Sequence, residues 1–169
     1  MTDNELRLKL SRIANGDTKA FDEVYSDMKT PIMTVIARIV QNRETAEDIL
    51  QEVFIKLYCS PPLNISKPRA YIFKTAGNLA VDFLRKTRQT VSLDDCEELY
   101  SDDGDRSERL DVEKALSRLE ERERQIVTLH INGGFKFREI AEMLEMPLGT
   151  AIWRYQKAIK QLRESLQAV

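Results

Sequence analysis

Residues 69–89 combine cations, an amide and an aromatic ring at helical spacing. Steps of 3, 4, 4 and 3 place five side chains on one helix face: Tyr71, Lys74, Asn78, Asp82 and Arg85. Cations neutralise phosphates, an asparagine can bond to a base edge, and a tyrosine ring can stack on an unpaired base. This face therefore suits single-stranded nucleic acid. A solvated helix face with Tyr71 turned into the core fits the same spacing, so both interpretations stay open.

Further cations lie at both ends of this segment. Lys67 and Arg69 precede or open it, and Lys86 and Arg88 lie near its end. The last two also suit the negative end of a helix dipole. On the opposite side, steps of 4, 3 and 4 predict a buried stripe of Ile72, Ala76, Leu79 and Phe83.

Residues 136–166 have the pattern of a helix-turn-helix. Pro147 prevents the first helix from continuing, and Thr150 is expected to cap the second. The expected inner positions are Phe137, Ile140, Ala141, Leu144, Ala151, Tyr155, Ala158 and Leu162, which turns Trp153, Arg154, Lys157 and Lys160 or Gln161 outward. In such motifs the second helix enters the major groove. Arg154 could then read a guanine, and the lysines would contact phosphates. A plain helical hairpin is the alternative.

The elements that carry these faces are all expected to be helices. Before the middle of the chain, apolar spacing predicts helices at 17–29, 31–41, 43–58 and 69–89, with Asp17 as an N-cap and Pro31 at a first helical position. The prolines of "SPPLNISKP" separate the last two. Helices at 111–131, 136–144 and 149–166 follow. The fold class is therefore all-α, as two small helical domains at 1–90 and 111–169.

The helix at 43–58 has one apolar and one acidic face. Its inward positions are Ala46, Ile49, Leu50, Val53, Phe54 and Leu57, and its outer positions are Glu47, Asp48, Gln51 and Glu52. The carboxylates alone indicate a solvated face. A metal-dependent nuclease using Glu47, Asp48 and Glu52 has thin support, because no second carboxylate cluster converges with them.

Composition narrows the class of protein. With 42% hydrophobic and 32% charged residues, six Gly and five Pro, the chain is typical of soluble proteins rich in amphipathic helices. No apolar run approaches the ~20 residues of a membrane span, and the start lacks a signal-peptide core. Cys59 and Cys96 form no metal or redox spacing, and the single histidine, His130, is expected to be structural. We expect a cytoplasmic protein without catalytic residues, metal or cofactor.

The acidic residues concentrate in one segment. Residues 91–110 carry 2 Lys/Arg against 8 Asp/Glu, whereas 1–90 carry 14 against 11 and 111–169 carry 10 against 9. Charge repulsion and few apolar residues predict a flexible linker at 91–110. An alternative is that this segment mimics nucleic acid and transiently covers a basic surface.

Several motifs together resemble the bacterial extracytoplasmic-function (ECF) sigma factors over nearly the whole chain. In the first half they are "AFDEVYSDM", "RETAEDILQEVFIKLY" and "PRAYIFKTAGNLAVDFLRK". In the second half they are "ALSRLEERERQIVTLH" and "EIAEMLEMPLGTAIWRYQKAIKQLR". The resemblance implies a sigma region 2 domain followed by a region 4 domain, which bind core RNA polymerase and promoter DNA. It also implies an anti-sigma partner.

The resemblance gives each outer face a role. The face of Glu47, Asp48, Gln51 and Glu52 would dock on the polymerase clamp coiled coil. The face from Lys67 to Arg88 would recognise and open the minus-ten element. Thr150, Trp153, Arg154, Lys157 and Lys160 would belong to the minus-thirty-five reader. For the large apolar ring of Trp153, a contact with an anti-sigma factor or with the first domain is the favoured alternative in the free chain. Two positions depart from the family pattern: Glu145 replaces the usual turn glycine, whose φ is positive, and Ala151-Ile152-Trp153 replaces a usually polar start of the recognition helix.

The expected linker is short for a promoter. Elements two helical turns apart lie ~70 Å apart, at ~34–36 Å per turn. A relaxed coil of ~20 residues spans only ~25 Å, and full extension gives ~65–70 Å. We therefore expect polymerase to stretch the linker, and the isolated chain to bind promoter duplex weakly. The rival class, an autonomous helix-turn-helix regulator, predicts a dimer on palindromic operator DNA, whereas a sigma factor is expected to be a monomer.

Overall fold

Helices make up every regular element of the part of the chain that is described. The computed structural model describes residues 1–90 and 106–167, and these divide between two compact units, Met1–Glu97 and Glu98–Val169. The prediction of an all-α fold with two helical domains is confirmed. Each unit is described by itself.

The start of the second unit differs from the expectation. Helix α5 (Arg106–Ser117) begins inside the predicted linker, whose remainder lies outside the described residues. The predicted single helix at 111–131 is wrong, because α5 ends and α6 (Glu121–Val127) begins after a break, followed by the π-helical turn η1 (Thr128–Asn132). The break lets both helices contribute to one core, which holds Leu116, Leu119, Val127 and Ala158.

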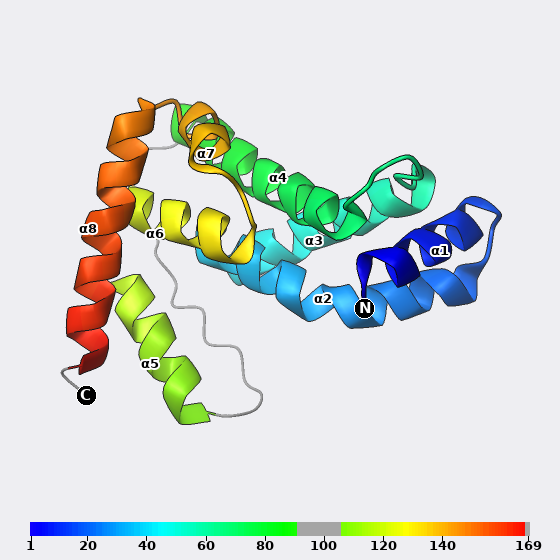
Figure 1. Ribbon diagram of the computed structural model, residues 1–169, viewed down its shortest axis with the longest axis horizontal. Helices are drawn as coiled ribbons and strands as arrows, with labels where there is room; N and C mark the ends of the chain where they lie inside the picture. Colours follow the sequence, from blue (N-terminus) through cyan, green and yellow to red (C-terminus); the bar gives the residue numbers. More distant parts are fainter. Residues whose placement is uncertain (91–105, 168–169) are drawn as a thin grey trace. The chain divides into compact units, whose positions relative to one another are not determined.

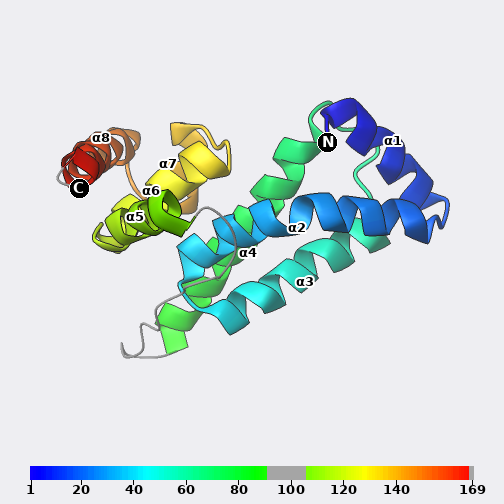
Figure 2. The same cartoon turned by 90° about the horizontal axis from the view of Figure 1, so that it is seen from below.

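Unit 1 is organised around a long central helix. Helix α2 (Thr18–Val40) packs against α1 (Asp3–Ala14), α3 (Arg43–Cys59) and α4 (Pro68–Thr90), as Figures 1 and 2 show. Its buried side chains are Ala20, Val24, Met28, Ile32, Val35, Ile36, Ile39 and Val40. The expectation that 31–41 lies at the centre of the domain is confirmed.

The expected division of this helix at Pro31 is wrong. Helix α2 runs through Pro31 without a break, so 17–29 and 31–41 are one element. A proline inside a helix removes one hydrogen bond and costs about 3 kcal/mol or more. Burial of Met28 and Ile32 on either side favours the continuous helix, since an interruption would displace one of them from the core. Asp17 caps the helix as predicted, accepting the Ala20 N–H at 3.1 Å.

Helix α1 was not predicted, although the sequence carries its signal. Thr2 and Glu5 form a capping box, in which the Glu5 N–H donates to Thr2 Oγ1 at 3.3 Å and the Thr2 N–H to Glu5 Oε2 at 2.7 Å. Leu6, Leu10 and Ile13 follow at steps of 4 and 3 and are buried. A Thr-x-x-Glu box before such a stripe is a helix-start signature.

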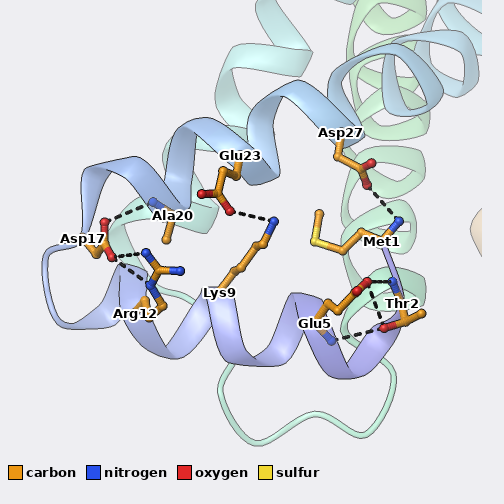
Figure 3. A network of polar contacts seen from close by, with 9 residues as sticks. All are labelled: Met1, Thr2, Glu5, Lys9, Arg12, Asp17, Ala20, Glu23 and Asp27. Atoms are coloured by element: carbon orange, nitrogen blue, oxygen red, sulfur yellow. Dashed lines mark hydrogen bonds and ion pairs between the residues drawn. The ribbon is translucent and has the colours of Figure 1, made fainter.

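Ion pairs hold α1 along the first half of α2 (Figure 3). Lys9 Nζ lies 2.8 Å from Glu23, and Arg12 Nη2 lies 2.7 Å from Asp17. The Lys9 hydrogen bond and charge lower the pKa of Glu23. The Ala20 N–H, followed by Arg12, lowers the pKa of Asp17.

Helix α1 also fixes the start of α4. Asp3 Oδ1 accepts the backbone N–H of Arg69 at 3.0 Å, within the first turn of α4. Arg7 donates to the carbonyl of Ser66 at 2.8 Å, in the connection before that helix. The helix begins at Pro68, a residue favoured at first helical positions because its missing N–H is not needed there. The N-terminal helix therefore positions the first turn of the candidate nucleic-acid helix.

Unit 2 packs α5, α6 and α7 (Phe137–Met143) against α8 (Leu148–Gln167). His130, in η1, has Nδ1 2.9 Å from the carbonyl oxygen of Phe135. Its ring stacks on Phe137 at 4.2 Å between centroids and meets Tyr155 edge-on at 5.0 Å. These contacts give His130 the structural role that the sequence favours.

Candidate nucleic-acid interface

The two faces of α3 are as predicted. Asn42 caps the helix by accepting the Thr45 N–H at 2.8 Å, and all six expected inner residues are buried. Glu47, Asp48, Gln51 and Glu52 are all exposed. Within the helix, Arg43 pairs with Glu47 at 3.0 Å and Lys56 with Glu52 at 2.9 Å. Asp48 has no ion-pair partner among the described residues.

An apolar pocket adjoins this acidic face, and sequence reasoning missed it. Its volume is about 530 Å³, and its lining residues are Phe21, Tyr25, Gln51, Phe54, Ile55, Tyr58 and Cys59. Gln51 belongs to both the acidic face and the pocket. Ile55 and Tyr58 are exposed, and they continue the line of Asp48 and Gln51 along α3 at helical spacing. The helical spacing of these four residues is the sequence feature from which this surface could have been predicted.

The polar face of α4 lies toward solvent. Tyr71 is 46% exposed, and Asn78, Asp82 and Arg85 are exposed, while Lys74 is half-buried. The alternative that turned Tyr71 into the core is therefore wrong. Arg85 lies 3.6 Å from Asp82, one turn away on the same face.

The cations at the ends of α4 differ in their surroundings. Lys67, Lys86 and Arg88 are exposed. Arg69 is half-buried, and its guanidinium lies 5.6 Å from the centroid of the Phe73 ring. The structure thus places Arg69, Lys86 and Arg88 on α4 and Lys67 directly before it, but leaves Arg69 packed against the protein.

The predicted buried stripe of α4 is wrong at its end. Ile72 and Ala76 are buried and Leu79 is half-buried, but Phe83 is 39% exposed. Val81 is the last buried side chain of α4 up to Arg88, and Leu84 is only half-buried.

The turn between α7 and α8 requires an unusual conformation of Glu145. The Met146 N–H donates to the Ala141 carbonyl at 2.9 Å and the Glu145 N–H to the Glu142 carbonyl at 3.2 Å. This is a Schellman cap, whose left-handed residue is usually glycine. Glu145 has φ 53°, so it takes the left-handed conformation although it replaces the glycine usual in the family. A left-handed residue other than glycine costs about 1–2 kcal/mol.

The inner face of the helix-turn-helix agrees with the prediction, but the cap does not. Ile140, Ala141, Leu144, Ala151 and Ala158 are buried, and the other three predicted inner residues, Phe137, Tyr155 and Leu162, are half-buried. Thr150 was expected to cap α8, which is wrong because the helix begins at Leu148. The Ala151 N–H donates to the Pro147 carbonyl at 3.1 Å, which places Thr150 inside the first turn.

The outward residues of α8 form two groups. Trp153 is 57% exposed and Lys160 is exposed. Arg154 and Lys157 are half-buried, and both pair with carboxylates at the start of α6. Arg154 Nη1 lies 3.1 Å from Glu120, and Lys157 Nζ lies 2.7 Å from Glu123. Sequence spacing could not show this, because the partners lie 34 residues apart.

In residues 1–90 and 106–167, no three His, Cys, Asp or Glu side chains converge in a way that could hold a metal ion. Within the same ranges, no helix has the length and apolar character needed to cross a membrane. The exposed faces offer charge, amide and aromatic contacts, which are suited to binding macromolecules.

Family models match both units. The model of sigma-70 region 2 matches residues 24–90, and that of sigma-70 region 4 matches residues 109–162. The ECF RNA polymerase sigma factor SigW of Bacillus subtilis is 26% identical over 181 residues, covering 96% of this chain and 97% of that protein. The RNA polymerase sigma factor CarQ of Myxococcus xanthus is 28% identical over 165 residues, covering 93% and 95%.

Solved structures share the fold. The structure of CnrH in complex with the cytosolic domain of CnrY has a TM-score of 0.57 at 19% identity, covering 97% of this chain and 98% of that one. The sigma factor RpoE in complex with the anti-sigma factor NepR, from Bartonella quintana, has a TM-score of 0.59 at 20% identity, covering 88% and 98%. With region 2 and region 4 both matched in one chain, and with relatives similar over nearly their full length, the chain belongs to the ECF RNA polymerase sigma factors.

Proposed function

We propose that three exposed helix faces divide the work of a promoter-specificity factor. The α3 face binds core RNA polymerase, the α4 face recognises and holds open the minus-ten element, and α8 reads the minus-thirty-five duplex. Membership of the ECF sigma factors is the observation that carries this function. The residue assignments rest on which side chains are exposed on these helices.

The α3 surface has the properties of a protein-docking site. Exposed carboxylates lie beside a pocket with an apolar, aromatic lining, and Gln51 joins the two. Buried aromatic anchors supply affinity in protein interfaces, and charges around them supply orientation and specificity. Polymerase would fill the pocket with an apolar side chain and face the carboxylates with cations.

The α4 surface suits an opened strand. Tyr71 offers an exposed ring for stacking, Asn78 an amide for a base edge, and Lys67, Lys86 and Arg88 cations for phosphates. The α8 surface suits duplex instead, because a helix with Arg154 near its start can enter a major groove.

The proposed setting is the cytoplasm of a bacterium, with the free chain a monomer held inactive by an anti-sigma factor. One similar structure is a sigma factor in complex with the anti-sigma factor NepR, and another is CnrH in complex with the cytosolic domain of CnrY. The proposed activity involves no catalysis and no cofactor. The family match does not favour the rival class, an autonomous dimeric regulator, and a dimer seen by analytical ultracentrifugation on palindromic DNA would revive it.

The test is reconstitution with core RNA polymerase on a genomic library, scoring initiation by sequencing transcript starts. We expect initiation at a small set of related promoters. Absence of initiation across a broad library would contradict the function.

A single charge reversal tests the docking surface. Asp48→Arg places a cation on the proposed interface, where like charges cost several kcal/mol, so polymerase binding should fall on the order of 100-fold or more. Helical content should stay unchanged, since Asp48 is exposed. Glu164→Arg, an exposed carboxylate of unit 2, is the matched control. If Asp48→Arg binds polymerase normally, the docking surface lies elsewhere.

A further inference from the structure

Two parallel ion pairs join α6 to the recognition helix. Glu120 and Glu123 are three residues apart, as are their partners Arg154 and Lys157. Because the spacings match, each carboxylate meets its own cation. We call Glu120–Arg154 and Glu123–Lys157 the α6–α8 ladder.

In the Glu123–Lys157 pair, the charge of Lys157 is used in a contact within the protein. Glu123 is 1% exposed, and a buried carboxylate needs a close counter-charge. Lys157 Nζ supplies it at 2.7 Å. The same ammonium lies 5.6 Å from the centroid of the Trp153 ring. Lys157 is therefore held between a buried carboxylate and an exposed aromatic ring.

The Glu120–Arg154 pair has a different geometry. Glu120 occupies the N-cap position of α6, yet its side chain makes no capping hydrogen bond. Its carboxylate contacts Arg154 Nη1 instead, at 3.1 Å. A guanidinium has five N–H donors, so one such contact leaves donors for another acceptor. It also restricts a long side chain that would otherwise lose entropy on binding.

We propose that Glu120 and Glu123 are positioning residues for promoter reading. Glu120 aims the guanidinium of Arg154 at a guanine of the minus-thirty-five element. Glu123 retains Lys157 as an internal counter-charge, so Lys157 is not a phosphate contact, and Lys160 fills that role. The inference rests on the proposed function, in which α8 enters the major groove. It revises the sequence-based assignment of Lys157.

Base preference tests Glu120. Core polymerase with the full chain, wild type or Glu120→Gln, would transcribe promoters randomised in the minus-thirty-five element. We expect preference for guanine at one position to fall about 5- to 10-fold, because a good bidentate contact supplies roughly 10-fold or more discrimination. Glu164→Gln removes the same charge away from Arg154 and should leave preferences unchanged. An identical base profile for Glu120→Gln would overturn the role of Glu120.

The salt dependence of promoter binding by the holoenzyme tests the role of Lys157. The double variant Glu123→Gln/Lys157→Gln removes both charges of the pair, and Lys160→Gln removes a proposed phosphate contact. Each lost phosphate contact lowers the slope of log affinity against log salt by about 0.9. We expect that decrease for Lys160→Gln and no change for the double variant. An equal decrease in both would place Lys157 on the phosphates and overturn its assignment.

The two kinds of failure are distinguishable. Absence of initiation by wild-type holoenzyme would contradict the proposed function itself. Normal initiation with unchanged base preference in Glu120→Gln would contradict only the ladder. Circular dichroism of the double variant checks that unit 2 is folded, and should it unfold, the Glu120→Gln library decides the proposal.

Discussion

The two candidate DNA helices are each held by carboxylates from another helix, but at different points. Helix α4 is held through its backbone, where Asp3 accepts the N–H of Arg69. Helix α8 is held through its side chains, where Glu120 and Glu123 pair with Arg154 and Lys157. The outward face of α4 keeps Tyr71 and Asn78 exposed, whereas Arg154 and Lys157 of α8 are already paired with carboxylates.

This difference fits the two kinds of DNA. An opened strand is flexible, and the side chains that stack on its bases can adapt to it. A duplex presents base edges at fixed positions, so a recognition helix binds with a smaller loss of entropy when its side chains are already held in place. Support of the backbone suits the first task, and support of the side chains suits the second.

The largest expected effect is a difference in unfolding free energy between breaking an ion pair of α8 and breaking one of α4. Lys157→Ala leaves the carboxylate of Glu123 buried without its partner. We expect unit 2 to lose roughly 2–3 kcal/mol, less than a fully buried pair would lose, because Lys157 is 40% exposed. Asp82→Asn breaks the Asp82–Arg85 pair on α4, which is exposed and should contribute about 0–1 kcal/mol. Urea unfolding followed by circular dichroism measures both.

A similar loss for both variants would contradict the contrast between a buried and a solvated pair. Lys157→Arg is the control for charge. It keeps a cation near Glu123 and should restore most of the lost stability.

The next largest effect distinguishes base stacking by Tyr71 on α4 from contacts of α8 with duplex DNA. Tyr71→Ala should slow open-complex formation about tenfold, within the ~1–3 kcal/mol of one stacked base. A template already melted at the minus-ten element should recover part of this loss. Trp153→Ala should not respond to pre-melting, since α8 contacts duplex. Stopped-flow fluorescence of promoter opening by holoenzyme reports both variants.

Tyr71→Phe keeps the ring and should open promoters at nearly the wild-type rate. If pre-melting also rescues Trp153→Ala, or fails to rescue Tyr71→Ala, the two helices do not divide strand opening and duplex reading in this way.

A smaller effect tests the backbone support of α4. Asp3→Ala removes the acceptor for the Arg69 N–H and should cost unit 1 about 1 kcal/mol, as a lost helix cap does. Asp3→Asn retains an oxygen acceptor and should be nearly neutral. Thermal unfolding compares the two. Equal melting temperatures would show that α1 does not support α4 through this bond.

The smallest effect is a pH dependence of the contacts between α1 and α2. Glu5, Asp17 and Glu23 have pKa values lowered by their hydrogen bonds and cationic neighbours. A carboxyl group whose pKa is lowered in the folded state stabilises the fold at pH values above its ordinary pKa, which is 4.5 for Glu and 3.8 for Asp. This stabilisation is lost as the pH falls through the lowered pKa of the folded state. Amide signals of α1 in NMR spectra should therefore weaken below about pH 4.5. Unchanged signals down to pH 3 would contradict the role of these pairs.

The helical faces could be predicted because they depend on local spacing. Periodicity alone assigned the buried and exposed positions of α3. The left-handed conformation of Glu145 was not predicted, because glutamate disfavours a positive φ. The prediction that Phe83 is buried was wrong, because periodicity shows which side of a helix faces the core but not at which residue the helix leaves the core. The ladder was missed because pairs between Glu120 and Arg154 depend on how distant helices meet.

Pro31 carries one more consequence. It has no N–H to donate to the carbonyl of Asp27, so α2 is continuous in shape but has a weak point in its hydrogen-bond ladder. The ion pairs in Figure 3 tie the segment before this point to α1. Local opening should therefore release α1 and residues 18–30 as one cooperative segment, with hydrogen-exchange protection lower than that of 32–40. The two helices expected from the sequence would reappear as two steps of unfolding.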